Sequence, residues 1–245
     1  MKNLIIATFT LAASLACNSA EINFLGTQNR FSFLHLDGPI QTGDLGKLET
    51  EFARIKSREG STSMILMLSS MGGNVDEAMR IGDFIEKNEI GTMVLEKFGI
   101  CVSACVFILA AGDHKTIKGK VGIHRPYVSD VSIGGEQGAK TLGQYLERIK
   151  AYLDSKGISP SLAEDMFSIP PEKVRYLSPE EISRYRLDQT NYLKQEATDI
   201  ETAKSLGLTR QEYGARKNQM NRECGGMPHA QMMACINRIM GTNLK

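Results

Sequence analysis

The strongest constraint on the fold is an alternation of short apolar runs with amphipathic segments along the first half of the chain. The apolar runs have the length and composition of strands, and they lie at 31–37, 63–68, 92–95 and 118–123. The segments 45–55 and 75–87 between them repeat apolar residues at helical spacing. Strands that alternate with helices are joined by right-handed crossovers and pair in parallel. We therefore predict an α/β fold built on a parallel sheet.

The first twenty residues have the organisation of an export signal. Lys2 provides a positive start, and the apolar stretch 4–16 is too short to span a membrane. Small residues follow, so that cleavage after Ala16 or after Ala20 would fit the pattern. Cys17 adds an alternative, a lipid-modified N-terminal cysteine. We expect a periplasmic or otherwise exported protein, with a cleaved signal peptide or a lipid anchor at Cys17.

The remaining cysteines and a change of composition define the rest of the chain. Cys101, Cys105, Cys224 and Cys235 are an even set, which in an oxidising compartment suggests disulfides with three possible pairings. The polar segment after Asp188 has a helical pattern and contains no apolar strand. We predict a signal peptide over 1–20, an α/β domain over 21–190 and a helical C-terminal extension over 191–245. We expect a Cys224–Cys235 disulfide to staple that extension.

Charge and motif content narrow the range of functions. The formal net charge is +1, which gives no general electrostatic reason to expect nucleic-acid binding. The sequence contains no G-x-S-x-G and no H-E-x-x-H, and the Gly72-Gly73 pair belongs to no nucleotide-binding motif. We therefore expect no cofactor.

Three short motifs could carry chemistry. A predicted strand runs into the turn Ser70-Met71-Gly72-Gly73, where glycines allow backbone N–H groups to approach a ligand. Ser103 begins a helix of small and apolar residues, where the helix dipole favours developing negative charge. His124 follows a strand end and precedes Pro126. Each motif is weak by itself, since glycine pairs, serines and histidines usually serve turns, capping and surfaces.

Taken in chain order, these motifs resemble the ClpP/crotonase superfamily, and in particular its Clp-protease-like serine peptidases. Five elements of the family have counterparts here. They are the Ser-Pro-Gly-Gly turn (70–73), the nucleophile helix that ends in Ala-Gly (103–112), the Ile-His-x-Pro segment (123–126), the handle helix (138–156) and the closing Tyr/Phe-Leu-Ser segment (176–181). The resemblance extends over about residues 30–188. It implies a spiral of β-β-α units with a parallel sheet.

The resemblance also implies roles for individual residues. Ser103 would be the nucleophile and His124 its general base. The backbone N–H groups of Gly73 and Ala104 would form the oxyanion hole. A peptide would bind in extended form beside a sheet edge.

The sequence departs from the family pattern at two positions. Met71 replaces the usual proline, which is tolerable because the glycines make the donating turn. Val174 occupies the position of the family's aspartate. Glu172 is the nearest acid and could take that role, although it also fits a solvated charge; two weaker candidates are Asp165 and Asp188. A Ser-His dyad, with a backbone carbonyl orienting the imidazole, is the other alternative.

The cysteines on either side of Ser103 allow three interpretations. With His114 and His124 they could bind zinc, but Cys105 opens an apolar helix that should be buried, and we expect no metal. They could be buried as small apolar residues. They could also form a disulfide that brackets Ser103.

The leading hypothesis is an exported serine hydrolase, a peptidase independent of ATP, that acts on peptides or unfolded proteins. No ATPase partner is expected outside the cytoplasm. The alternative is a periplasmic binding or scaffold protein with a decayed site, which Val174 favours. Export argues against crotonase-type acyl-CoA chemistry, and no lysine is placed for a Ser-Lys pair. We also expect self-association through 138–156, because family members stack through the matching helix.

Overall fold

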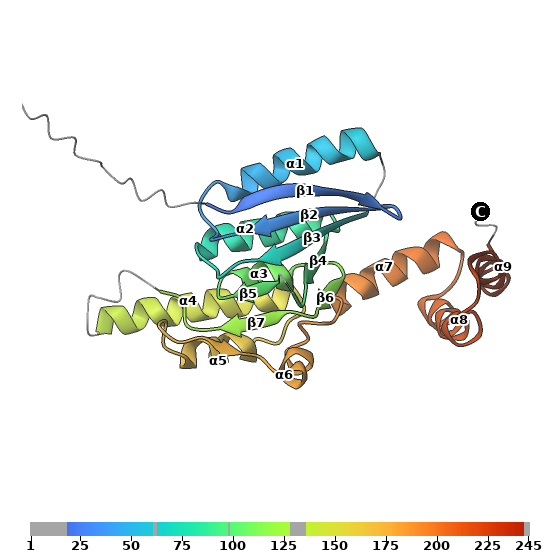
Figure 1. Ribbon diagram of the computed structural model, residues 1–245. Coiled ribbons are helices and arrows are strands. Elements are labelled where there is room, and N and C mark those ends of the chain that lie inside the picture. The colour runs from blue at the N-terminus through green and yellow to red at the C-terminus, as the bar shows by residue number, and fades with distance from the viewer. Residues whose placement is uncertain (1–18, 61–62, 98, 128–135, 243–245) are drawn as a thin grey trace, which may run out of the picture.

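The structure is a computed structural model that describes residues 19–60, 63–97, 99–127 and 136–242. The predicted signal segment therefore lies almost wholly outside the described residues. Figure 1 shows the arrangement of the elements. The strands are β1 (Glu21–Gln28), β2 (Phe31–Asp37), β3 (Ser63–Ser69), β4 (Gly91–Val94), β5 (Ile100–Val102), β6 (Lys115–Ile117), β7 (Lys120–Ile123) and β8 (Arg175–Tyr176). The helices are α1 (Asp44–Glu59), α2 (Val75–Lys87), α3 (Cys105–Ala110), α4 (Glu136–Ser155), α5 (Ser161–Ser168), α6 (Pro179–Arg184), α7 (Tyr192–Ser205), α8 (Arg210–Glu223) and α9 (His229–Met240).

Two sheets form the centre of the α/β part. The larger sheet has the strand order β1-β2-β3-β4-β6, and all its pairs are parallel except β1 with β2. The smaller sheet has the order β5-β7-β8, with β5 and β7 parallel. The predicted mixed α/β fold with mostly parallel strands is confirmed. Strand β1 was not predicted, because Gly26 and a register shift after Phe24 interrupt its alternating pattern.

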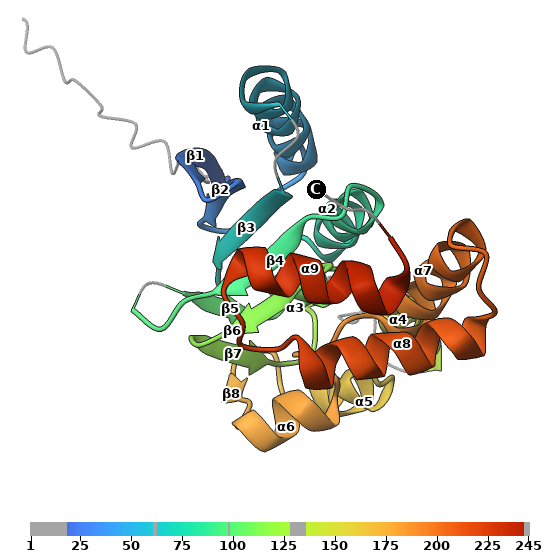
Figure 2. The same cartoon turned by 90° about the vertical axis from the view of Figure 1, so that its right-hand side faces the viewer.

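The core lies where the amphipathic helices meet the larger sheet. The β2 and β3 residues Leu34 and Leu66 are partners in the parallel register, and both are fully buried. Helices α1 and α2 lie on the same side of this sheet (Figure 2). They bury their apolar faces there, with Ile55 from α1 and Ile81 from α2 almost inaccessible to solvent. Burial of such side chains contributes about 1.5–3 kcal/mol each and favours this arrangement.

The connections at the carboxyl ends of β3 and β5 determine where the site lies. After β3, a glycine turn leads into α2, whose N-cap Asn74 accepts a hydrogen bond from the Glu77 N–H. After β5, Ser103 and Ala104 lead directly into the short buried helix α3. A parallel bridge between Ser70 and Cys101 joins these two connections. The two predicted motifs are therefore adjacent in space.

The folded part of the chain includes Ala20, one residue before the expected boundary at 21. Ala20 is fully buried, and its N–H donates to the buried carboxylate of Asp44 over 3.3 Å. Its carbonyl accepts a hydrogen bond from Lys47 Nζ at 2.8 Å. Loss of Ala20 would leave the buried Asp44 with fewer donors. Ala20 is therefore part of the packed core.

The C-terminal helices α7, α8 and α9 form a small array beside the α/β part (Figures 1 and 2). A disulfide joins Cys224 to Cys235, the pair expected from the sequence. Lys194 of α7 forms an ion pair with Asp113 at 2.7 Å and so connects the array to the rest of the molecule. Across the described residues, no helix is both long and apolar enough to cross a membrane.

Candidate active site

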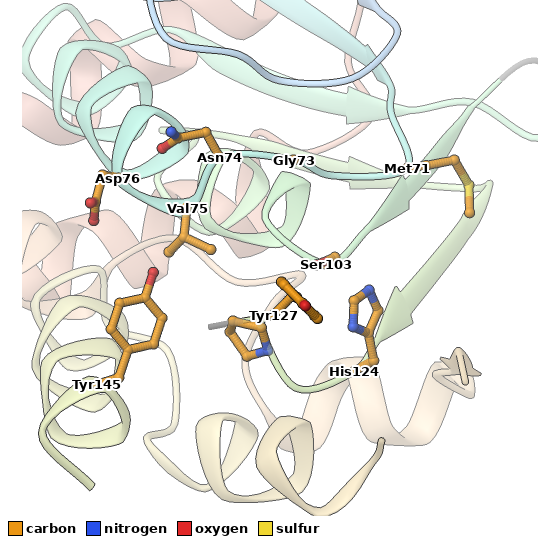
Figure 3. Close-up of a pocket in the computed structure, with 10 residues that line it drawn as sticks. Met71, Gly73, Asn74, Val75, Asp76, Ser103, His124, Tyr127 and Tyr145 are labelled. Carbon is orange, nitrogen blue, oxygen red and sulfur yellow. The ribbon is translucent and has the colours of Figure 1, made fainter. Parts of the chain in front are cut away.

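A pocket of about 610 Å³ lies at the carboxyl ends of the parallel strands β3, β5 and β7. Figure 3 shows the side chains that form the walls of this pocket. Its lining residues are Met71, Gly73, Asn74, Val75, Asp76, Ser103, His124, Pro126, Tyr127 and Tyr145. The pocket thus brings together Ser103, His124 and Gly73, three residues that the sequence placed in separate motifs.

Ser103 has an unusual backbone conformation. Its φ is +58°, in the left-handed region that a residue with a side chain adopts at a cost of about 1–3 kcal/mol. Its N–H donates to the Gly122 carbonyl of β7 at 3.0 Å, which fixes it beside the next strand. Its hydroxyl makes no hydrogen bond within the described part of the chain. This conformation directs an unengaged serine into the pocket.

The glycine turn comes very close to Ser103. Gly72 has a φ of +99°, and a Cβ at this position would lie 2.7 Å from Ser103 Cβ and 3.0 Å from the Ala104 nitrogen. Gly73 has a φ of +142°, and a Cβ there would lie 2.2 Å from the Ile40 carbonyl oxygen. Only glycine permits both approaches, because it has no Cβ. The turn therefore packs its backbone directly against the serine loop.

Two backbone donors near the serine are not used by the fold. The Ile40 N–H donates to the Gly72 carbonyl, and the Asn74 N–H donates to the Ile40 carbonyl. These two hydrogen bonds make the bridge between Ile40 and Gly73 without using the Gly73 N–H. Among the described residues, neither the Gly73 N–H nor the Ala104 N–H has an acceptor. Unsatisfied N–H groups at such positions can stabilise an oxyanion.

The imidazole of His124 faces the same pocket from the end of β7 (Figure 3). Its Nδ1 lies 2.8 Å from the carbonyl oxygen of Arg125. A carbonyl oxygen can only accept, so Nδ1 carries the proton and Nε2 keeps a lone pair. The tautomer with a basic Nε2 is the one that a general base requires. Among the described residues, no hydrogen bond joins Ser103 Oγ to this ring; hydrogen bonds between catalytic groups often form only when substrate binds.

No carboxylate takes the third position of a triad in the described residues. Strands β7 and β8 pair Ile123 with Arg175, and one further step of this register would place Val174 opposite His124. Glu172 is exposed, and no hydrogen bond or ion pair joins it to another residue that the structure describes. Asp165 is instead bonded to Tyr185 and paired with Arg175 and Arg184. Asp188 accepts from Ser183. The Arg125 carbonyl occupies the Nδ1 side of the imidazole instead.

A disulfide between Cys101 and Cys105 brackets Ser103. Both cysteines are fully buried, and their Cα atoms are 5.2 Å apart. Of the three interpretations that the sequence allowed, the structure has the disulfide. Sulfur atoms bonded to each other are not the thiolates that zinc requires, and His114 is exposed. The described residues hold no group of three or more metal-binding side chains.

Sequence reasoning did not identify the far wall of the pocket. Asp76 of α2 forms an ion pair with Arg148 of α4 at 2.6 Å, and this pair joins the two helices beside Tyr145. Burial raises the pKa of the Tyr145 hydroxyl, and the Asp76 charge raises it further. From the sequence, Tyr145 is expected only on the apolar face of the predicted helix 138–156. The signal that distinguishes Tyr145 from the other residues of that face is its hydroxyl, because a hydroxyl needs a polar surface next to it.

Comparison with known proteins places the α/β part in a family. No curated protein matches the chain. The family model described as Clp protease matches residues 26–161. This range includes the glycine turn, Ser103, His124 and all of α4, and it ends before Val174. Because the match covers more than half of the sequence, the chain belongs to the Clp protease family.

Proposed function

We propose that this protein is an exported serine peptidase that works without an ATPase, with Ser103 as nucleophile and His124 as general base. Membership of the Clp protease family supports serine peptidase chemistry. One observation carries the assignment of residues. An unengaged serine with left-handed backbone shares a pocket with a histidine whose Nε2 is free to accept a proton.

The proposed reaction follows from these groups. His124 Nε2 accepts the hydroxyl proton as Ser103 Oγ attacks the peptide carbonyl, and the carbonyl oxygen becomes an oxyanion. The Gly73 and Ala104 N–H groups donate to this oxyanion. The protonated imidazole then gives its proton to the leaving amine, and an acyl-enzyme forms. Water hydrolyses the acyl-enzyme with His124 again as base.

The Arg125 carbonyl serves as the orienting partner of the imidazole in this proposal. In a Ser-His-Asp triad the carboxylate both holds the tautomer and stabilises the imidazolium. A neutral carbonyl at 2.8 Å performs the first task and performs the second only partly. We therefore propose a dyad assisted by a backbone carbonyl, with a lower rate than a full triad would provide.

The pocket walls suggest the kind of substrate. Met71, Val75, Pro126 and Tyr127 present apolar or aromatic surface beside Ser103, and the described wall contains no lysine or arginine side chain. Such a surface favours a short or unfolded peptide with apolar side chains next to the scissile bond. Self-association through α4 remains a prediction.

The cysteines support the location of this activity. Two disulfides within one chain are typical of proteins from oxidising compartments. We propose that the chain is exported, either with a cleaved signal peptide or with a lipid anchor at Cys17. Direct mass analysis of the protein recovered from the cell envelope distinguishes these two forms.

The test is hydrolysis of a set of fluorogenic peptides by the wild type and four variants. Ser103→Ala and His124→Ala should each remove nearly all activity, and the double variant should be little worse than either, because the two groups act as one unit. His114→Ala is the matched control, since this histidine is exposed and outside the pocket. Full activity in folded Ser103→Ala protein would contradict the proposal.

The second candidate function is a scaffold or binding protein on the same fold. Val174 at the aspartate position of the family is the observation that favours it. A folded wild type that hydrolyses no peptide and no ester would support this alternative.

A further inference from the structure

The Cys101–Cys105 disulfide lies where it can control the geometry of the site. Cys101 belongs to β5 and is bridged to Ser70 of the glycine turn, while Cys105 begins α3. The chain between them contains Ser103 and Ala104, the proposed nucleophile and one proposed oxyanion donor. The bond therefore closes a small ring around both groups. Neither cysteine lines the pocket, so neither can contact a substrate there.

The conformation of Ser103 needs such a restraint. A left-handed residue with a side chain persists only when its surroundings over-determine it. On the strand side, the Ser103 N–H donates to the Gly122 carbonyl and the Val102 N–H donates to the Ser70 carbonyl. On the helix side, the Val106 N–H donates to the Ser103 carbonyl at 3.0 Å. The disulfide adds a covalent tie between the strand and the first turn of α3.

The small ring that the Cys101–Cys105 disulfide closes argues against a role limited to the stability of the whole protein. The two cysteines are separated by 4 positions in sequence, whereas Cys224 and Cys235 are separated by 11. In the chain-entropy account the shorter loop contributes less to the stability of the whole protein. The bond with the smaller expected effect on stability is thus the one beside the nucleophile.

We propose that the Cys101–Cys105 disulfide is a positioning element that holds Ser103 and the Ala104 N–H in their reactive arrangement. This inference rests on the proposed function. Cys101 and Cys105 are positioning residues and take no part in the bond-making steps. Reduction by a dithiol, which supplies two electrons and two protons, converts the bond to two thiols and releases the loop. The oxidised protein is therefore the active form.

The experiment compares Cys101→Ala/Cys105→Ala with Cys224→Ala/Cys235→Ala. The rate of labelling by a fluorophosphonate, kcat, KM and thermal stability are measured for each. Because a misplacement of about 1 Å costs roughly 100-fold, labelling and kcat of the first variant should fall by about that factor, with KM changed less than about threefold. The second variant should keep wild-type kcat despite the larger loss of stability.

Single variants distinguish a loss of activity caused by breaking the bond from a loss caused by poorer packing of the core. If the bond acts as one unit, Cys101→Ala, Cys105→Ala and the double variant lose activity equally, whereas losses from packing would add. If the double variant is poorly folded, Cys101→Val/Cys105→Ala restores apolar volume in the strand and repeats the test. Reduction and reoxidation in the Cys224→Ala/Cys235→Ala background should lower and then restore labelling.

The outcomes distinguish this inference from the proposed function. A wild type that is labelled at Ser103, together with a folded Cys101→Ala/Cys105→Ala variant labelled at the same rate, overturns the positioning role alone. A wild type that is not labelled at Ser103 overturns the proposed function, and the inference with it. A loss of kcat in both double variants would show a general effect of stability and would also overturn the inference.

Discussion

Replacement of Gly72 by alanine perturbs the contact between the glycine turn and the nucleophile loop. The new Cβ would lie 2.7 Å from Ser103 Cβ and 2.8 Å from the Val102 carbonyl oxygen. Nonbonded carbon atoms pack at about 3.5–4.0 Å, so the turn and the loop must separate by about 1 Å. The displaced atoms include the Ala104 nitrogen, 3.0 Å from the same Cβ. The variant therefore moves one proposed oxyanion donor as well as the serine.

The expected size of the effect follows from this displacement. A misplacement of about 1 Å costs roughly 100-fold in rate. The φ of +99° at Gly72 adds about 1–2 kcal/mol of backbone strain for alanine, and the overpacking adds about 1–3 kcal/mol. We expect Gly72→Ala to lower kcat about 100-fold and the free energy of unfolding by about 2–5 kcal/mol.

Peptide hydrolysis and urea unfolding measure the two effects separately. Gly143→Ala is the matched control, because Gly143 lies inside α4 and nothing is within 4 Å of its new Cβ. Alanine there should leave kcat unchanged and raise the free energy of unfolding by about 0.5–1 kcal/mol. Wild-type kcat and stability in Gly72→Ala would refute the close packing of the turn on the serine loop.

Three further predictions concern Glu172, the partly buried Lys115 and the C-terminal disulfide. Glu172→Gln should change kcat by no more than a few-fold, because Glu172 is exposed and no hydrogen bond joins it to the imidazole in the described part of the chain; a loss on the order of 10³–10⁴ would place it in a triad. Burial lowers the pKa of Lys115 to about 8 from 10.5, so the unfolded chain holds more protons between these values and stability should rise with pH across that range. Lys115→Met should flatten this rise in urea-unfolding curves, and an unchanged slope would contradict the assignment to Lys115. Cys224→Ala/Cys235→Ala should lower the free energy of unfolding of the C-terminal helices by about 2–3 kcal/mol, and unchanged hydrogen exchange in α8 and α9 would count against that.

The parallel core was predictable because its signals are local. Apolar runs such as 63–68 alternate with helical segments such as 75–87, and that pattern allows few topologies. The same topology explains why separate motifs meet. The glycine turn, Ser103 and His124 each follow a strand, and parallel strands bring their carboxyl ends to one edge.

Other features depend on contacts that no local pattern encodes. The bond from His124 Nδ1 to the Arg125 carbonyl arises from the bend of the backbone after β7. The pairing of Cys101 with Cys105 depends on how close β5 brings the start of α3. Asp76 lies in the pocket wall, where it forms an ion pair with Arg148 of α4, a residue far away in sequence. Each of these required the tertiary structure.

The resemblance points to a carboxylate for the third position of the site. Because triads contain an acid and Val174 is apolar, Glu172 is the nearest candidate in the sequence. In the structure the Nδ1 side of the imidazole is already occupied by a carbonyl. The backbone carbonyl that the sequence analysis kept as an alternative is therefore the partner that the geometry favours.

The central claim, that Ser103 is an activated nucleophile, is tested most directly with a fluorophosphonate probe. The probe is incubated with the purified, folded protein, and the labelled residue is identified by peptide mapping. One phosphonyl group should appear on Ser103 of the wild type, and none should appear in Ser103→Ala. Folded wild type with intact disulfides that remains unlabelled at Ser103 would contradict it.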